Sequence, residues 1–423
     1  MTSRPIGFVG ETSTPVEITV KATQPVPAGT YIYLKFRVRD PISGQDLERE
    51  VVGVIGSVSF KSYVPIVTTT RSEISESYIS ELKRESYMNA VIVADITGNR
   101  TEPPRYPPPP ETPVYPARVE HLKVVYPGRS ERSVKIGSLL GFEELSISVD
   151  VNALAKHLLV VGTTGSGKSN FVAVLADRVA QLGGSVVIFD VHGEYRGLQS
   201  ESHRVHVVDY EATINLVKTP IEMLVRFIIP ESAATKQRRI LRNALRKLNE
   251  EVEKVAQEYR VAYSEAVKRL YSRHRGGRGL RSSESVENPI DMYRELLKEY
   301  VTREHTVGSS SAERSVEDVK DKIDDFFEWH NVGLDTPNVS EIVGCGKVVV
   351  VDVSALVDAE KDYMLKVIAE DLLWSLKQRR IPPTMLVVEE AHLFISSKTQ
   401  TWSKESLQRF IREGRKFGGM LVI

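Results

Sequence analysis

The sequence predicts an α/β fold in which a parallel sheet follows a small β-barrel and is interrupted by a helical insertion. Short runs with alternating apolar and polar residues fill residues 1–98, a pattern typical of small antiparallel barrels. From about residue 131, Val/Ile/Leu-rich runs alternate with helical spacing, as in buried parallel strands joined by helices. Residues 230–335 have helical spacing and no strand pattern.

Length and composition limit the class of protein. A chain of 423 residues suits two or three domains, and 41% apolar with 26% charged residues indicates a globular chain. Lys+Arg and Asp+Glu both number 56, so any surface for a polyanion must be local. The single cysteine, Cys345, excludes a disulfide framework. Without a signal peptide or an apolar run of ~18 residues, we expect a cytoplasmic protein.

The first domain is expected to span residues 1–130. Period-two alternation predicts strands at Val16–Val20, Tyr31–Arg39 and Val51–Phe60. Glu73–Tyr87 has helical character, and Asn89–Thr97 returns to the strand pattern. Together these elements indicate the small barrel.

A proline-rich stretch at residues 101–116 cannot be a helix or a central strand, so we expect an extended loop or linker. A rigid spacer is favoured over a ligand for an SH3-type domain. Arg118–Tyr126 is then expected to be the last barrel strand.

The sheet is expected in two parts of the chain, residues 131–229 and 336–423. Its strands should be Leu158–Gly162, Ser185–Asp190, Lys347–Asp352, Thr384–Glu389 and Gly419–Ile423. These runs are apolar on both faces, as buried parallel strands are, and helices separate them. The layout is that of a RecA-like core.

The helical insertion, residues 230–335, separates these two parts. Its predicted helices are Lys236–Tyr271, Asp291–Tyr300 and Val316–Trp329. Residues 236–281 are rich in Lys and Arg. The pattern fits two interpretations equally, a solvated helix face with an exposed loop or a surface for DNA or another partner.

The segment Gly162–Ser169 fits the phosphate-binding pattern G-x-x-x-x-G-K-[ST], between an apolar strand and a helix at Asn170–Leu182. Backbone N–H groups of such a loop and the helix N-terminus bind phosphate oxygens. We expect Lys168 on the β- and γ-phosphates of ATP and the Ser169 hydroxyl on Mg²⁺. The predicted nucleotide-binding residues are Gly162, Thr163, Thr164, Gly165, Ser166, Gly167, Lys168, Ser169 and Asn170.

Two carboxylates, Glu389 and Glu390, end the apolar strand at 384–389. Successive side chains of a strand point in different directions. We therefore expect Glu389 to join the Mg²⁺ shell through water and Glu390 to polarise the attacking water. The alternative is a solvated pair of acids. Because other strands intervene along the chain, this strand and the P-loop strand should not be neighbours in the sheet.

Asp190 ends the strand that follows the P-loop helix, where α/β sheets bind ligands, so Asp190 or Glu194 is expected near the nucleotide. For His192, a packed loop histidine is favoured over a metal ligand. Arg415 belongs to the basic side of a helix predicted at 403–417 and is expected at the edge of the nucleotide site, acting on its own subunit or a neighbour. A solvated helix end is the alternative.

These motifs together resemble the HerA family of archaeal DNA translocases, within the HerA/FtsK superfamily. The matching segments are GTTGSGKSN at Gly162–Asn170, DVHGEY at Asp190–Tyr195, VEEAH at Val388–His392 and GRKFG at Gly414–Gly418. The family usually has proline where this chain has Val191. The early β region resembles the family's HAS barrel.

The resemblance implies catalytic roles for Lys168, Asp190, Glu390 and Arg415, the last as a nucleotide-sensing arginine. Lys156 falls where a family arginine reaches into the adjacent subunit, but lysine lacks the planar guanidinium fork. The family forms hexameric rings around double-stranded DNA and acts with the nuclease NurA in DNA end resection for recombinational repair. Relatives continue beyond the strand in which this chain stops, so we expect a truncated C-terminus.

An ATP-driven DNA translocase is the leading functional prediction. A nucleotide-dependent clamp or scaffold that recruits a nuclease is the first alternative, and a conjugation- or secretion-type pump ATPase is the second. DNA-stimulated ATP turnover separates the motor from the clamp.

Overall fold

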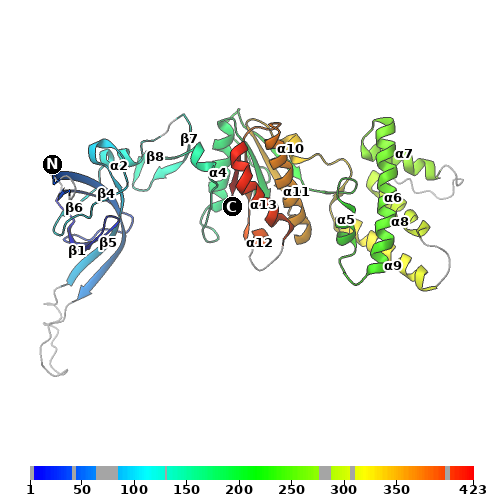
Figure 1. Cartoon of the computed structure of the whole chain (residues 1–423), viewed down its shortest axis with the longest axis horizontal. Helices are drawn as coiled ribbons and strands as arrows, with labels where there is room; N and C mark the ends of the chain where they lie inside the picture. Colours follow the sequence, from blue (N-terminus) through cyan, green and yellow to red (C-terminus); the bar gives the residue numbers. More distant parts are fainter. Residues whose placement is uncertain are drawn as a thin grey trace, which may run out of the picture. The chain divides into compact units, whose positions relative to one another are not determined.

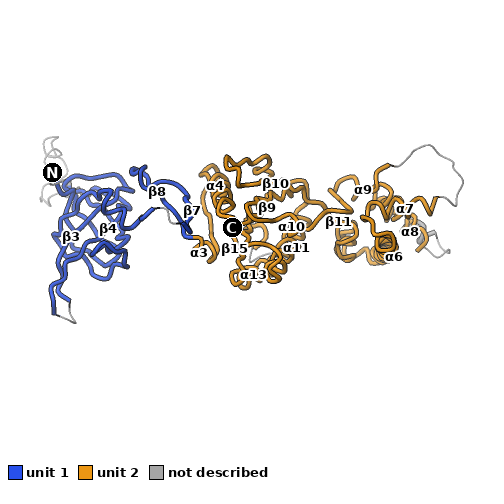
Figure 2. The backbone as a smooth tube through the Cα atoms, turned by 90° about the horizontal axis from the view of Figure 1, so that it is seen from above, with its two compact units in different colours: residues 1–150 blue, residues 151–423 orange. Residues whose placement is uncertain are grey.

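The computed structural model describes residues 4–40, 44–62, 84–128, 131–275, 287–304, 310–395 and 401–423. Contacts between residues divide the chain into two compact units, residues 1–150 and 151–423 (Figure 2).

Unit 1 contains a closed antiparallel barrel with the strand order β1-β2-β5-β4-β3-β6 (Figure 1). The strands are β1 (Gly7–Ser13), β2 (Glu17–Ala22), β3 (Tyr31–Arg39), β4 (Asp46–Ser62), β5 (Arg84–Asp95) and β6 (Pro113–Pro116). Alternate residues such as Ile32, Leu34 and Phe36 of β3 point inward and are buried. The barrel predicted from period-two alternation is therefore present.

Two predictions for unit 1 were wrong. Arg118–Tyr126 is not a strand, because Val119–Val125 forms helix α2. The proline-rich stretch instead supplies the closing strand β6, which pairs with β1 and β3. β6 is only four residues long, and its prolines stand at its two ends, so the missing N–H groups interrupt little of the pairing. The predicted helix at 73–87 lies outside the described residues up to 83, and 84–87 belong to β5.

The remaining elements of unit 1 are η1 (Thr97–Asn99) and a hairpin of β7 (Ser133–Leu139) with β8 (Phe142–Asp150). Leu122 of α2, Leu139 of β7 and Leu145 of β8 share a small core with residues of β4 and β5. The hairpin thus packs with the barrel, whereas the sequence grouped residues from 131 with the sheet.

Unit 2 is built on a five-stranded parallel sheet with the order β10-β13-β9-β14-β15. Its strands are β9 (Ser185–Asp190), β10 (His206–Glu211), β13 (Lys347–Asp352), β14 (Thr384–Val388) and β15 (Gly419–Val422). β9 and β14 are buried throughout, which explains their continuous apolar runs. All predicted strands here except the P-loop strand are confirmed, and β10 is an additional strand.

The segment before the P-loop lies along β15 at the edge of the sheet. Leu158 bridges Val422 in parallel, and Ile423 N–H donates to the Leu158 carbonyl at 3.0 Å. The segment is a single bridge rather than the predicted strand Leu158–Gly162. β15 separates it from β14, which confirms that the two motif-bearing segments are not neighbours.

Helices connect the strands of unit 2 (Figure 1). They are α3 (Val151–Leu154), α4 (Lys168–Gln181), α10 (Val339–Ile342), α11 (Asp358–Lys377), α12 (His392–Ile395), α13 (Trp402–Gly414) and η2 (Arg415–Phe417). The helix predicted at 170–182 is α4, and the helix predicted at 403–417 is α13 followed by η2.

The insertion between β10 and β13 consists of helices and one short pair of strands. Its elements are β11 (Ile214–Asn215), α5 (Ile221–Ile228), α6 (Thr235–Tyr259), α7 (Tyr263–Arg275), α8 (Pro289–Arg303), α9 (Ser310–Trp329) and β12 (Val332–Gly333). The helix predicted at 236–271 is broken at Arg260, which has a left-handed φ of 52°. β11 pairs with β12 in parallel where the chain leaves and re-joins the core.

A buried polar contact fixes the insertion to this pair of strands. The Tyr293 hydroxyl donates to Asn249 Oδ1 at 2.6 Å, and Asn249 Nδ2 donates to the Leu216 carbonyl at 2.9 Å. Tyr293 is fully buried. α8, α6 and the end of β11 are therefore joined by side-chain hydrogen bonds in a dry environment. No helix among the described residues is long and apolar enough to cross a membrane.

Candidate nucleotide-binding site

A cavity of about 420 Å³ opens at the carboxyl ends of β14 and β15, against the N-terminus of α4. This is the edge of a parallel sheet at which α/β proteins bind ligands. The lining residues are Val160, Thr164, Gly165, Gly167, Lys168, Ser169, Asn170, Val172, Glu194, Tyr195, Val387, Val388, Glu389, Glu390, Val422 and Ile423. The cavity therefore brings together the P-loop and the two acids that the sequence predicted would face it.

The P-loop has the backbone that its glycines permit. Gly165 and Gly167 have φ values of 79° and 92°, which L side chains rarely adopt. A Cβ on Gly162 would lie 2.4 Å from Ser166 Oγ. Lys168 begins α4, and its Nζ donates to the carbonyls of Gly162 at 3.0 Å and Thr163 at 3.2 Å. The ammonium group is thus held at the mouth of the loop.

Asp190 organises the loop that follows β9. Its side chain is fully buried, and its carboxylate accepts from the N–H groups of Gly193, Glu194 and Tyr195 at 2.8, 3.1 and 2.8 Å. Asp190 does not line the cavity. The predicted catalytic residue therefore shapes the site through its loop, because both carboxylate oxygens already accept backbone hydrogen bonds.

Glu194 meets the P-loop directly. The Ser169 hydroxyl donates to Glu194 Oε2 at 2.7 Å. The sequence named Glu194 beside Asp190 and could not choose between them, since the turn determines which carboxylate points at α4. Tyr195, which also lines the cavity, was missed; its pKa is raised mainly by burial and by the charge of Glu389.

Glu389 lies among other carboxylates. Burial and the charges of Asp190 and Glu194 raise its pKa to about 8. Its Oε2 accepts from the Val191 N–H at 3.3 Å. A proline at 191, usual in the resembled family, could not make this bond. The side chain is therefore fixed between the ends of β9 and β14.

Glu390 faces different surroundings from its neighbour. It has a left-handed φ of 47°, and its carboxylate lies 3.1 Å from His392 Nδ1. Its side chain is 35% exposed but still lines the cavity. The predicted divergence of the two acids is thus seen in their contacts. The His392 contact was not anticipated.

Oxygen ligands around Ser169 fit Mg²⁺. The Ser169 hydroxyl and the carboxylates of Glu194 and Glu389 are hard donors, the kind that Mg²⁺ prefers, often through water. Burial, together with the charges of Asp190 and Glu194, raises the pKa of Glu389, so a nearby cation would favour its charged form. The residues present are therefore compatible with a magnesium ion brought by nucleotide phosphates.

Arg415 lies away from this cavity. It begins η2, ahead of β15, and β15 runs parallel to β14 with Gly419 opposite Thr384. Arg415 therefore lies at the amino ends of these strands, whereas the cavity lies at their carboxyl ends. Arg415 was expected at the edge of the nucleotide site, acting on its own subunit or on a neighbour. Within its own subunit it does not line the cavity, because sequence proximity to β15 did not take the direction of the strand into account.

His157, just before the P-loop segment, contacts both α13 and β15. Its Nδ1 accepts from the Leu421 N–H at 3.1 Å, and its Nε2 lies 3.0 Å from the Ile411 carbonyl. The neighbouring Lys156 is exposed. The P-loop segment, α13 and β15 therefore share one imidazole, a link that the sequence reasoning missed.

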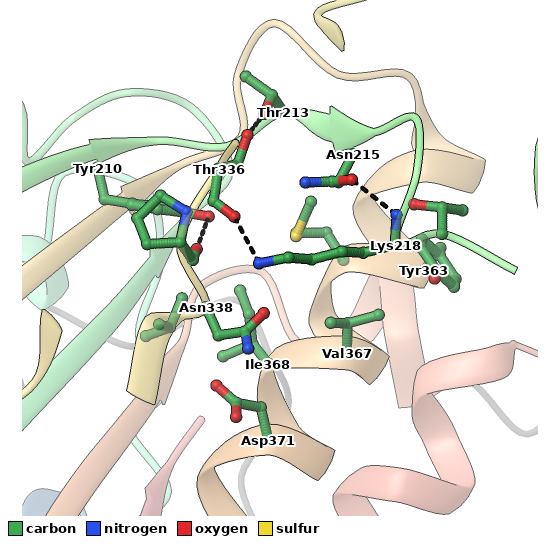
Figure 3. Close-up of a pocket in the computed structure, with 14 residues that line it drawn as sticks. Tyr210, Thr213, Asn215, Lys218, Thr336, Asn338, Tyr363, Val367, Ile368 and Asp371 are labelled. Atoms are coloured by element: carbon green, nitrogen blue, oxygen red, sulfur yellow. Dashed lines mark hydrogen bonds between the residues drawn. The ribbon is translucent and has the colours of Figure 1, made fainter. Parts of the chain in front are cut away.

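A second pocket, of about 80 Å³, lies where the insertion joins the core (Figure 3). Lys218 Nζ donates to the Thr336 carbonyl at 3.4 Å, and the Tyr210 hydroxyl donates to the Pro337 carbonyl at 3.0 Å. Asp371 of α11 points toward the same space (Figure 3). The polar groups that line this pocket mostly form hydrogen bonds with one another, so the pocket marks the place where the insertion is attached to the core of unit 2.

A family model for the central domain of the helicase HerA matches residues 134–372. The DNA double-strand break repair helicase HerA of Sulfurisphaera tokodaii is 29% identical over 99% of this chain and 78% of its own length. The same protein of Saccharolobus solfataricus is 30% identical over 99% of this chain and 77% of its length.

The solved structure of VirB4 of Thermoanaerobacter pseudethanolicus covers 70% of this chain and 77% of its own, with 17% identity and a TM-score of 0.40, too low to carry an argument. The family model spans more than half of the chain, and the relatives align over nearly all of it. The chain belongs to the HerA helicase family of ATP-hydrolysing enzymes.

Proposed function

We propose that this protein is an ATP-driven translocase or helicase on double-stranded DNA that works as a ring-shaped oligomer in double-strand break repair. The names of its relatives support the DNA substrate and the repair context. The main support for an ATP-driven motor is the cavity that is lined by Lys168 and Ser169 of the P-loop and by Glu389 and Glu390. The arrangement supplies phosphate binding and a base in one place.

Lys168 is proposed to bind the β- and γ-phosphates of ATP. Its ammonium group, now shared by two P-loop carbonyls, has three hydrogens and can turn to phosphate oxygens without leaving the mouth of the loop. Glu390 is proposed to accept a proton from the water that attacks the γ-phosphoryl group. Its partial exposure and position on the cavity wall give it access to that water.

Mg²⁺ would neutralise charge that develops on the β- and γ-phosphate oxygens. Ser169 is proposed to hold it with a hydroxyl lone pair while the hydroxyl proton is donated to Glu194, as it is in the structure. Glu389 would contact it through water from the other side. Asp190 is proposed as a positioning residue that fixes Glu194 through the N–H groups of their loop.

Arg415 is proposed to act on the nucleotide of a neighbouring subunit. Arg415 lies at the amino end of β15, whereas the cavity of its own subunit lies at the carboxyl end. In a ring, the amino edge of one sheet could face the carboxyl edge of the next sheet, so that Arg415 would reach the neighbour's nucleotide. A hexamer with double-stranded DNA in its centre is the assembly we propose. Lys156, which is exposed, is proposed at the same boundary.

The barrel is proposed to be a HAS barrel, and a NurA-type nuclease is the proposed partner, so that the motor feeds DNA ends to resection. We propose the domain division at 1–130, 131–229, 230–335 and 336–423 as the functional one, although the hairpin β7–β8 at the start of the second segment packs with the barrel.

Displacement of a protein block from DNA tests the motor. Streptavidin bound to a biotinylated duplex should be released by the protein only with ATP and Mg²⁺, and Glu390→Gln should bind the duplex without releasing it. A clamp or scaffold would bind DNA with nucleotide and leave the block in place. ATP-dependent release is the expected result, and binding without release by the unaltered protein would contradict the proposal.

A further inference from the structure

Three arginines stack on two tyrosines where α6 meets α7, two helices of the insertion whose ribbons are drawn in Figure 1. The Arg269 and Arg273 guanidinium carbons lie 4.7 and 5.5 Å from the ring centre of Tyr259. The Arg275 guanidinium carbon lies 4.8 Å from the ring centre of Tyr271. This Arg–Tyr surface, defined by these five residues, has no part in the nucleotide site.

Local structure fixes the Arg–Tyr surface. α6 ends because Arg260 adopts a left-handed conformation, and the Asp335 carboxylate accepts from the first two N–H groups of α7. α7 consequently packs back against α6. Arg269 and Arg273 are four residues apart, so both fall on one face of α7, above Tyr259. The side chains are thus placed before any ligand arrives.

Stacking uses the faces of the guanidinium groups and leaves N–H donors at their edges. Arg273 donates one hydrogen bond, from Nη2 to the Tyr259 hydroxyl at 2.9 Å. Arg269 is partly neutralised by Glu265 at 3.0 Å. Within the described residues, Arg273 and Arg275 form no ion pair with a carboxylate. Their remaining donors can bind oxygens of a phosphate in pairs.

Charge and surface character indicate the partner. Residues 258–275 contain five cationic side chains, Arg260, Lys268, Arg269, Arg273 and Arg275, against the two carboxylates Glu258 and Glu265. Tyr259, 42% exposed, is the one large apolar side chain exposed on α6 and α7 in the described part. A protein partner would need a larger apolar centre. A polyanion that contacts charge without burying apolar surface is favoured.

We propose that the Arg–Tyr surface binds the phosphodiester backbone of duplex DNA, through Arg273 and Arg275, at a place separate from the ATP-driven core. Taking DNA as the polyanion rests on the proposed function. The contact would be independent of base sequence, because only phosphates are bound. It would hold DNA near the motor while the core steps.

Duplex binding measured by fluorescence anisotropy over a series of salt concentrations tests the proposal. Arg273→Gln with Arg275→Gln removes both free guanidinium groups. Loss of two phosphate contacts should lower the slope of log affinity against log salt by about two and weaken binding roughly ten-fold or more at ~0.1 M salt. Arg239→Gln with Arg246→Gln, on the exposed side of α6, removes the same charge elsewhere and serves as the control.

The control should change the slope and affinity little. Equal losses in both double variants, or unchanged binding in Arg273→Gln/Arg275→Gln, would overturn the proposal. Arg273→Lys with Arg275→Lys should retain most of the slope, since the charge remains. If the unaltered protein fails to bind duplex DNA, the proposed function falls as well, whereas normal binding with no effect of the variants refutes the Arg–Tyr surface alone.

Discussion

Neighbouring carboxylates at the end of β14 differ in what surrounds them. Burial and the charges of Asp190 and Glu194 raise the pKa of Glu389 to about 8, and its carboxylate accepts from the Val191 N–H. Glu390 turns away through a left-handed backbone and approaches His392. One acid is thus suited to a cation and the other to a water molecule.

Exchange of each acid for its amide should separate these roles. Glu390→Gln should bind ATP about normally and hydrolyse it roughly 10²-fold or more slowly, because the base is lost while the shape remains. Glu389→Gln should instead weaken Mg²⁺-dependent nucleotide binding. Equilibrium binding and single-turnover hydrolysis measure both. If loss of Glu389 spares binding and stops hydrolysis, the two roles are reversed.

Substitution of Glu194 should weaken the binding of Mg²⁺ more than the binding of the nucleotide. Glu194→Gln cannot accept the Ser169 hydroxyl proton as strongly, so the Mg²⁺ concentration needed for half-maximal binding of a fluorescent ADP analogue should rise about ten-fold. Binding of the analogue without metal should stay unchanged, and Glu201→Gln, exposed in the same loop, is the control. An unaltered Mg²⁺ midpoint would remove Glu194 from the site.

Sequence reasoning at this scale succeeded where chemistry is tied to a motif. Lys168, Ser169, Glu389 and Glu390 face one cavity as predicted. Asp190 was placed in the right region, but its burial beneath three N–H groups depends on a turn that no spacing reveals.

At the scale of secondary-structure elements, some strands and helices could be predicted from local sequence patterns and others could not. Buried strands such as β9 and β14 were predictable because a short segment that is apolar on both faces is typical of a strand buried inside a parallel sheet. β6 was not, since its prolines argue against a strand, and only closure of the barrel stabilises it. α2 was misassigned because a seven-residue amphipathic segment fits either period.

A buried tyrosine hydroxyl contributes to the packing of the insertion. Tyr293→Phe would leave the Asn249 amide oxygen without its 2.6 Å donor in a dry environment. A loss of about 1–3 kcal/mol in the free energy of unfolding is expected. Urea unfolding followed by circular dichroism measures it. A free energy equal to that of the unaltered protein would show that the hydroxyl contributes nothing to holding α8 on α6.

At the scale of the whole molecule, the role that we propose for Arg415 rests on a second subunit. Arg415 lies at the amino end of β15, away from the cavity of its own subunit. A sequence pattern does not reveal how the strands of one subunit are oriented relative to those of another. In the proposed ring, a neighbouring cavity would give the residue its role.

Mixed assemblies test this requirement. Arg415→Ala and Lys168→Ala proteins should each lose most ATP hydrolysis, by about 10³-fold where the arginine acts directly on the phosphoryl group. Mixing them should partly restore hydrolysis, since an intact Lys168 cavity can face an intact Arg415. The absence of recovery, with mixed rings verified by native mass spectrometry, would show that Arg415 does not act across subunits.

ATP hydrolysis with and without duplex DNA tests the central claim most directly. The protein should hydrolyse ATP faster when duplex DNA is added, and Lys168→Ala should abolish hydrolysis in both conditions because the phosphoryl charge is no longer stabilised. A rate that ignores DNA would contradict the motor. A Lys168→Ala protein that hydrolyses ATP at the unaltered rate would contradict the site itself.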